Sequence, residues 1–190
     1  MDELMNTPDS FNLTFDSRQF RNALGSFATG VAVVACVAED GTPLASTVSS
    51  FNSVSLDPPL VLFSLANSAL SLQSWLDARH YTVSVLHADQ AALSNRFARA
   101  GEDKWRDVCP VRGPVTDLPL LPNALAWFEC AAYGQHEGGD HTIMVGRVLS
   151  FRTRMQSDDQ PLVFFKGRYR KLARESEALP VDDGLYLHAW

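Results

Sequence analysis

The strongest constraint on the fold is a succession of short β-rich runs separated by turn residues. Residues 31–38 form one such run of small and β-branched side chains, and it stops at Glu39-Asp40-Gly41, where Asp-Gly favours a tight turn. Further strand-like runs occupy residues 43–55, 60–65, 81–86, 124–133 and 142–151. Strands and helices do not alternate regularly, which argues against a doubly wound parallel sheet. The pattern predicts a mainly β protein, a Greek-key-like antiparallel barrel with helices packed outside.

Helical spacing of apolar residues predicts a few short helices beside these strands. The first follows Asp16 and Ser17, either of which can cap its first turn, and is expected to end at Gly30. Further helices are expected at residues 68–76 and 91–97, and a loop with a short edge strand near Val115 is expected at residues 101–122.

Length and composition favour one cytoplasmic domain that does not bind nucleic acid. The 190 residues, 46% of them hydrophobic, suffice for one core, expected over residues 17–172 between a flexible N-terminus (1–16) and a C-terminal tail (173–190). The 16 Lys and Arg against 22 Asp and Glu give a net charge of −6, which argues against a polyanionic partner. Three widely spaced cysteines suggest a reducing compartment, and neither a signal peptide nor an apolar run of membrane-spanning length is expected.

Two nucleotide-binding motifs are excluded by the residues present. Residues 25–30 have the glycine spacing of a phosphate-binding loop, but Val31-Ala32 stands where Lys and Ser or Thr are required. No G-x-G-x-x-G pattern follows an expected strand. A nicotinamide cofactor would therefore not be held in a Rossmann crevice.

The run of residues 47–55 presents hydroxyl groups on both faces of the expected strand, together with the ring of Phe51. Hydrogen-bond donors and acceptors of this kind suit the polar edge of a flavin ring system. Strands rich in Ser and Thr also occur on ordinary solvated surfaces. Taken alone, the run leaves a flavin site and a solvated strand equally open.

A second candidate site lies at Ser68 and Ser71, at the expected start of a helix. Unpaired N–H groups and the helix dipole favour an anion there, so the phosphate of a flavin could bind. Capping of the helix by either serine is the more ordinary function of such residues.

Gly139-Asp140-His141 stands at the end of residues 135–140, the expected turn of a second hairpin, and at the start of an apolar strand. An imidazole at the mouth of a core strand can donate a hydrogen bond and titrates near neutrality. A turn with an incidental histidine is one alternative. Metal binding is another, but no metal site is expected because the ligands would crowd one flexible turn, namely His136, Glu137, Asp140 and His141.

Several blocks together resemble the short-chain flavin reductase family, the reductase components of two-component flavin monooxygenases. The blocks occur in family order at residues 27–31, 47–55, 58–62, 96–98 and 139–148. The similarity spans roughly residues 20–171. One block would be a weak indication, whereas five in order are specific.

The resemblance implies an FMN-binding split β-barrel that forms a homodimer. It implies FMN or FAD as the flavin and NADH or NADPH as the hydride donor, with His141 beside the nicotinamide as the catalytic residue. The cofactor-binding residues that it implies are Thr47, Val48, Ser49, Ser50, Phe51, Ser53, Ser64, Ser68, Ala69, Ser71, Phe97, Ala98, Asp140, His141, Arg168 and Tyr169.

These features together predict an NAD(P)H:flavin oxidoreductase that supplies reduced flavin to a partner monooxygenase. Hydride would pass from the nicotinamide to the flavin, while strand hydroxyls steady the flavin ring and His141 positions the nicotinamide. Two alternatives remain open. One is a flavoenzyme that retains its flavin and acts on another acceptor, and the other is a non-catalytic flavin-binding or electron-carrier module.

Overall fold

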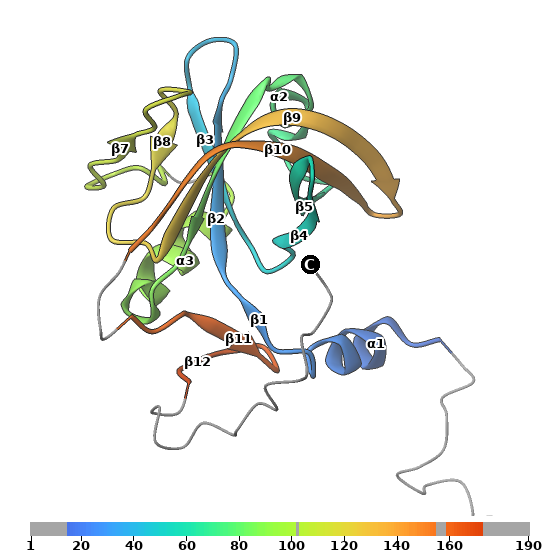
Figure 1. Cartoon of the computed structure of the whole chain (residues 1–190). Coiled ribbons are helices and arrows are strands. Elements are labelled where there is room, and N and C mark those ends of the chain that lie inside the picture. The colour runs from blue at the N-terminus through green and yellow to red at the C-terminus, as the bar shows by residue number, and fades with distance from the viewer. Residues whose placement is uncertain (1–14, 102, 155–158, 173–190) are drawn as a thin grey trace, which may run out of the picture.

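The computed structural model describes residues 15–101, 103–154 and 159–172 (Figure 1). Most of the expected N-terminal segment 1–16 and all of the expected tail 173–190 lie outside these residues. Among the helices that are described, none is long and apolar enough to cross a membrane.

A seven-stranded antiparallel sheet forms the body of the protein, in the order β3-β2-β6-β9-β10-β5-β4. Its strands are β2 (Ala32–Val37), β3 (Pro43–Val48), β4 (Asn52–Leu56), β5 (Pro59–Ala66), β6 (His80–Val85), β9 (Ala126–Gly138) and β10 (His141–Thr153). The sheet curls until β3 approaches β5, and Figure 1 shows an open barrel beyond which β9 and β10 extend. The predicted antiparallel barrel is confirmed.

Short helices and two small sheets surround this barrel. The helices are α1 (Ser17–Leu24), α2 (Leu72–Asp77), the 3-10 turn η1 (Ala88–Gln90) and α3 (Ala91–Ala98). One small sheet joins β1 (Thr29–Gly30), β11 (Val163–Phe165) and β12 (Arg168–Arg170), and the other pairs β7 (Val111–Arg112) with β8 (Pro119–Leu120). In Figure 1, α1 and the β1-β11-β12 sheet lie at one end of the barrel, away from α2.

The first helix ends earlier than the sequence predicts. The Asp16 side chain caps it as expected, accepting a hydrogen bond from the Gln19 N–H at 2.7 Å, but the helix stops at Leu24. Gly30 belongs instead to β1, where it pairs with Val163 of β11. The predicted end at Gly30 was wrong because pairing with a segment far along the chain leaves no trace in local spacing.

The predicted strand over residues 43–55 is two strands. β3 stops at Val48 and β4 begins at Asn52, and these two strands are the opposite edges of the seven-stranded sheet. Residues 49–51 therefore cross from one edge to the other. Local strand propensity continues through the crossing, so the sequence alone does not reveal it.

The second hairpin is longer than predicted. β9 and β10 pair as far as Gly138 and His141, so Gly139 and Asp140 alone form its turn, and Gly139 has a φ of +74°. Residues expected in the turn before them are strand. The short edge strand expected near Val115 is present as two short strands, β7 and β8, on either side of the turn that contains Val115.

The core has two parts, one on each face of β2. Val34 packs in a cluster with Phe63 and Trp75 inside the barrel. Its neighbour Val33 packs in a second cluster that includes Phe97 of α3. Because both faces of β2 are buried, this strand shows a continuous apolar run rather than alternation.

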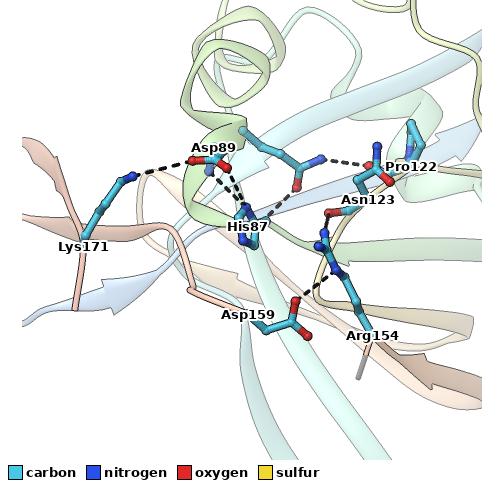
Figure 2. Close-up of polar contacts among 8 residues, drawn as sticks. His87, Asp89, Pro122, Asn123, Arg154, Asp159 and Lys171 are labelled. Carbon is cyan, nitrogen blue, oxygen red and sulfur yellow. Dashed lines mark hydrogen bonds and ion pairs between the residues drawn. The ribbon is translucent and has the colours of Figure 1, made fainter. Parts of the chain in front are cut away.

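Backbone hydrogen bonds hold residues 160–162 against the connection between β6 and α3. Figure 2 shows two ion pairs that this part of the chain also makes. Arg154 pairs with Asp159 at 2.9 Å, and Lys171 lies 3.6 Å from Asp89. The backbone hydrogen bonds join residues 160–162 to residues 86–88. These contacts fix the β11–β12 hairpin relative to α3.

Candidate functional site

A cavity of about 1050 Å³ lies where β3 and β5 approach each other without pairing as strands. One wall consists of β3 and the residues after α3, and the other consists of β5, the turn after it and the start of β10. The predicted site residues that line it are Thr47, Val48, Ser49, Ser50, Ser64, Ser68, Ala69, Ser71, Ala98 and His141. Segments far apart in sequence thus meet at one cavity.

The Ser50 hydroxyl joins the two walls. It accepts a hydrogen bond from the Ser64 N–H at 2.9 Å and lies 3.5 Å from the Ser64 carbonyl oxygen. Pairing between β4 and β5 reaches only as far as Leu62, so the next part of the β5 edge faces this serine and the cavity. Backbone polar groups at an unpaired edge need partners, which explains why hydroxyl residues gather here.

Helix α3 and the residues after it fix the β3 wall. The Thr47 hydroxyl donates to the Ser94 carbonyl oxygen of α3 at 2.7 Å. The Lys104 ammonium donates to the carbonyl oxygens of Ala45 at 2.8 Å and Phe97 at 3.0 Å. Because the Thr47 proton is committed to α3, its oxygen is left to accept a hydrogen bond from a ligand.

Asn67 joins the turn after β5 to the turn of the long hairpin. Its backbone N–H donates to the Asp140 carbonyl at 2.9 Å, and its side-chain N–H donates to the Gly139 carbonyl at 3.0 Å. Its side-chain oxygen accepts from the Thr142 hydroxyl at 2.8 Å. These bonds hold the expected phosphate turn beside His141, the expected nicotinamide residue.

The helix after this turn is shorter than predicted. α2 begins at Leu72 rather than Ser68, and its N-cap residue Ser71 makes no side-chain capping bond. Capping of α2 therefore accounts for neither serine, and both line the cavity. A helix of six residues has a small dipole, so the case for an anion at this turn depends on the hydroxyl groups.

His141 borders the cavity with its side chain 46% exposed. Its Nδ1 lies 2.7 Å from Asp140 Oδ1. An ionised carboxylate only accepts, so Nδ1 carries the proton that is shared with Asp140, and Nε2 is an acceptor when the ring carries no second proton. The same hydrogen bond, followed by the charge interaction with His141, lowers the pKa of Asp140 below its ordinary value. Asp140 thus fixes the orientation of His141 without lining the cavity itself.

Three further predicted residues lie on segments that adjoin the walls but are not part of the cavity lining. Phe97 is fully buried, with its ring centroid 5.0 Å from that of Trp105. Phe51 packs on Phe128 of β9, with centroids 5.6 Å apart. Ser53 lies in β4, beyond the crossing segment. Direct contact of these side chains with a flavin stays a prediction.

Arg168 and Tyr169 lie in β12, which is also outside the lining. The Tyr169 hydroxyl lies 2.7 Å from the Ser94 hydroxyl and donates to Asn95 Oδ1 at 3.1 Å. Tyr169 therefore supports α3, the helix that holds Thr47. Contact of Arg168 or Tyr169 with a cofactor stays a prediction as well.

Three residues at or beside the cavity were not predicted from the sequence, namely Asn67, Lys104 and Trp105. The signal for Asn67 was an amide directly after an apolar strand, a frequent turn position. The signal for the other two was a Lys-Trp pair within an otherwise Gly- and Asp-rich loop. Neither signal says which way the side chain points, so neither could rank these residues above other loop residues.

The lining suits a flavin nucleotide. Its size is close to the upper end of the roughly 300–1,000 Å³ typical of ligand pockets, and hydroxyl groups line both walls. A polar, hydrogen-bonding ring with a phosphate tail fits a cavity of this size with hydroxyl groups on both walls.

The comparison with known families agrees with this geometry. A family model described as a flavin reductase like domain matches residues 24–173. The chain belongs to this flavin reductase family. The matched residues include the barrel, both walls of the cavity and the β11–β12 hairpin.

Individual flavin reductases show how far the likeness extends. The chain is 44% identical over 162 residues to the FMN reductase (NADH) SmoA of Agrobacterium fabrum, a match that covers 84% of this chain and 88% of SmoA. It is 37% identical over 159 residues to the reductase component of a flavin-dependent trigonelline monooxygenase of Acinetobacter baylyi, covering 84% of this chain and 50% of that protein.

A solved flavin reductase has the same fold. The NADH:FAD oxidoreductase SgcE6 of Streptomyces globisporus, in complex with NAD and FAD fragments, superposes with a TM-score of 0.79 at 36% identity. The match covers 85% of this chain and 96% of SgcE6. The barrel is therefore the split barrel that the sequence predicts for a flavin reductase.

Proposed function

We propose that this chain is an NADH-dependent flavin reductase that reduces FMN or FAD and releases the reduced flavin to a partner oxygenase. The observation that carries this function is the cavity at which the hydroxyl-rich strand, the serine turn and His141 meet. Relatives named as an FMN reductase using NADH and as monooxygenase reductase components support it. NADPH is the second donor to test.

The walls of the cavity bind and orient the two ligands. Hydride passes from the nicotinamide to the flavin when both are bound. Thr47 offers an acceptor oxygen to the flavin, while Ser68 and Ser71 offer hydroxyl groups to its phosphate. Since α3 fixes one wall and Asn67 the other, the reacting rings are held in one arrangement, and orientation of this kind supplies much of the rate of a two-substrate reaction.

His141 positions the nicotinamide. Its Nδ1–H is bound to Asp140, so Nε2 can accept a hydrogen bond from the carboxamide N–H of a nicotinamide. The half-exposed position of the ring at the cavity border suits contact with the ligand that binds second. Hydride transfer removes no proton at this atom, so His141 acts as a positioning group rather than as an obligatory base.

The active form is a homodimer. Strands β4 and β10, which both pair with β5, expose apolar side chains, among them Leu56 at 69% and Phe151 at 70%. Phe151 also stacks on Phe128, with centroids 6.3 Å apart, so the exposed ring continues an aromatic cluster. A second copy of the chain would remove this apolar surface from water.

The protein acts in the cytoplasm, where its cysteines stay reduced. Cys36, Cys109 and Cys130 are all free, and Cys36 and Cys130 are buried. Burial raises the pKa of both buried thiols to about 12, which disfavours the reactive thiolate.

The decisive experiment is an anaerobic assay of NADH and NADPH against riboflavin, FMN and FAD, followed at the NAD(P)H absorbance band. Oxidation of NADH together with accumulation of free reduced flavin is the expected result. Failure to oxidise either nicotinamide with any flavin would contradict the enzymatic function. Cycling of a bound flavin without free reduced flavin would contradict its release and favour a retained cofactor.

A further inference from the structure

Lys104 is the one lysine or arginine among the described residues that line the cavity. It lies in the segment after α3, next to Asp103 and Trp105. A nucleotide phosphate would bring negative charge into a protein whose net charge is already −6. Local positive charge would favour its binding, and Lys104 is the source of that charge on the described lining.

The Lys104 ammonium is anchored by neutral groups. Nζ donates to the Ala45 carbonyl of β3 at 2.8 Å and to the Phe97 carbonyl of α3 at 3.0 Å. An ammonium has three N–H donors, so one remains after these two bonds. None of the carboxylates in the described part of the chain forms an ion pair with it.

Because Lys104 is partly buried, a nearby anion would stabilise the charge of its ammonium group. Loss of solvent lowers the pKa of Lys104, because burial disfavours the charged form. The hydrogen bonds to the two carbonyl oxygens offset part of the desolvation cost and hold the ammonium group at the β3 wall. An anionic group in the cavity would complete the surroundings of the ammonium.

The other basic feature of the sequence is the turn at Lys166, Arg168 and Arg170. It lies in and beside β12, and these residues are outside the described lining of the cavity. Lys166 instead lies over the ring of Phe165, 5.4 Å from its centroid. Position thus favours Lys104 over the denser basic turn.

Building on the proposed reductase function, we propose that Lys104 binds the phosphate of the flavin, the monophosphate of FMN or the pyrophosphate of FAD. Its third N–H makes the contact from the β3 wall, while Ser68 and Ser71 belong to the opposite wall. Riboflavin has the same ring without a phosphate and lacks this contact. Lys104 is therefore the cationic residue of the lining that favours phosphorylated flavins over riboflavin.

The test compares Lys104→Gln and Lys104→Arg with Lys171→Gln, a matched loss of one charge at an exposed lysine near Asp89. In Lys104→Gln, the KM for FMN and for FAD should rise roughly tenfold to a hundredfold, the usual range for loss of a charged hydrogen bond. The KM for riboflavin should change by less than about twofold. Lys104→Arg should recover most of the FMN affinity, and Lys171→Gln should match the parent protein.

A binding measurement without NADH separates this proposal from the reductase function. Fluorescence titration should show FMN binding more tightly than riboflavin, with a preference that salt weakens in the parent protein and that Lys104→Gln lacks. Equal losses for FMN and riboflavin would reduce Lys104 to a wall support and overturn the proposal. So would a raised KM for NADH with riboflavin as acceptor, which would assign the phosphate to the nicotinamide. A parent protein that binds FMN through Lys104 yet never oxidises NADH would contradict the reductase function alone.

Discussion

Two hairpin turns of this protein each contain a glycine at positive φ, and they differ in what they border. The β9–β10 turn has Gly139 at a φ of +74°, and the β11–β12 turn has Gly167 at +73°. Both turns close antiparallel hairpins, and a charged residue stands directly beside the glycine in each. The first reaches the cavity through His141, whereas the second contributes no residue to the described lining.

The difference follows from the strands beside each turn. β10 pairs with β5, whose end borders the cavity, and Asn67 ties the two together. β11 pairs with β1 in a separate small sheet, and Tyr169 ties β12 to α3. A turn therefore acquires a role from the strand that it lies against, and its own residues do not determine that role.

The largest expected effect comes from His141→Ala. Loss of the nicotinamide contact should lower kcat/KM for NADH by roughly tenfold to a hundredfold, with little change in flavin affinity. NADH titration at saturating flavin and a separate flavin titration measure the two effects. Arg168→Ala is the matched change in the other hairpin and should have a smaller effect. An equal loss in both variants would remove the distinction between the turns.

Asn67→Ala should have the next largest effect, because it removes the side-chain hydrogen bonds between the end of β5 and the β9–β10 hairpin. The variant loses the bond to the Gly139 carbonyl and the bond from the Thr142 hydroxyl. We expect a loss of stability of about 1–2 kcal/mol, or roughly 2–8 °C in Tm, and a severalfold lower kcat/KM. Thermal unfolding and steady-state kinetics measure both. Asn52→Ala is the control, because the Asn52 side chain accepts a hydrogen bond only from the N–H of its neighbour Ser53. Identical behaviour of the two variants would contradict a structural role for the Asn67 hydrogen bonds.

The titration of Asp140 tests whether the β9–β10 turn holds His141 through a hydrogen bond. Its pKa lies below 3.8 because His141 donates a hydrogen bond to it and adds a favourable charge interaction. A carboxyl group with a lowered folded pKa contributes stability that is present above its unfolded pKa and lost as pH falls through the folded pKa. The pair should therefore persist below pH 3.8, the ordinary value for Asp. Carbon-13 NMR titration of the carboxyl group tests this, and His141→Ala should return the pKa toward 3.8. An ordinary pKa in the parent protein would contradict the pairing.

The smallest expected effect belongs to Tyr169→Phe. Removing the hydroxyl leaves the buried Ser94 without this partner, so the free energy of unfolding should fall by about 0.5–1.5 kcal/mol. The KM for flavin should stay nearly constant if the residue only supports α3. Urea unfolding and flavin titration measure the two quantities, with Ser94→Ala as the matched partner. A large rise in KM at unchanged stability would instead place Tyr169 in contact with the ligand.

Local pattern predicted the parts of the fold that depend on neighbouring residues. The run at residues 31–38 became β2, the Asp16 cap formed, and residues 91–97 became α3. The hydroxyl-rich residues after Thr47 could be predicted because an unpaired strand edge needs polar partners, and the Ser and Thr residues that supply them are visible in the local sequence. His141 was found because a Gly-Asp turn before an apolar strand is a local signal.

The tertiary structure alone decided which edges meet and what lies between them. The break between Val48 and Asn52, the pairing of Gly30 with Val163, the bonds of Asn67 and the direction of Lys104 all depend on segments far apart in sequence. Such contacts are selected by burial and by the hydrogen bonds available at the assembled edges, which no local propensity contains. Sequence therefore determined that this chain has a hydroxyl-rich strand and a histidine turn, and packing determined that they share one cavity.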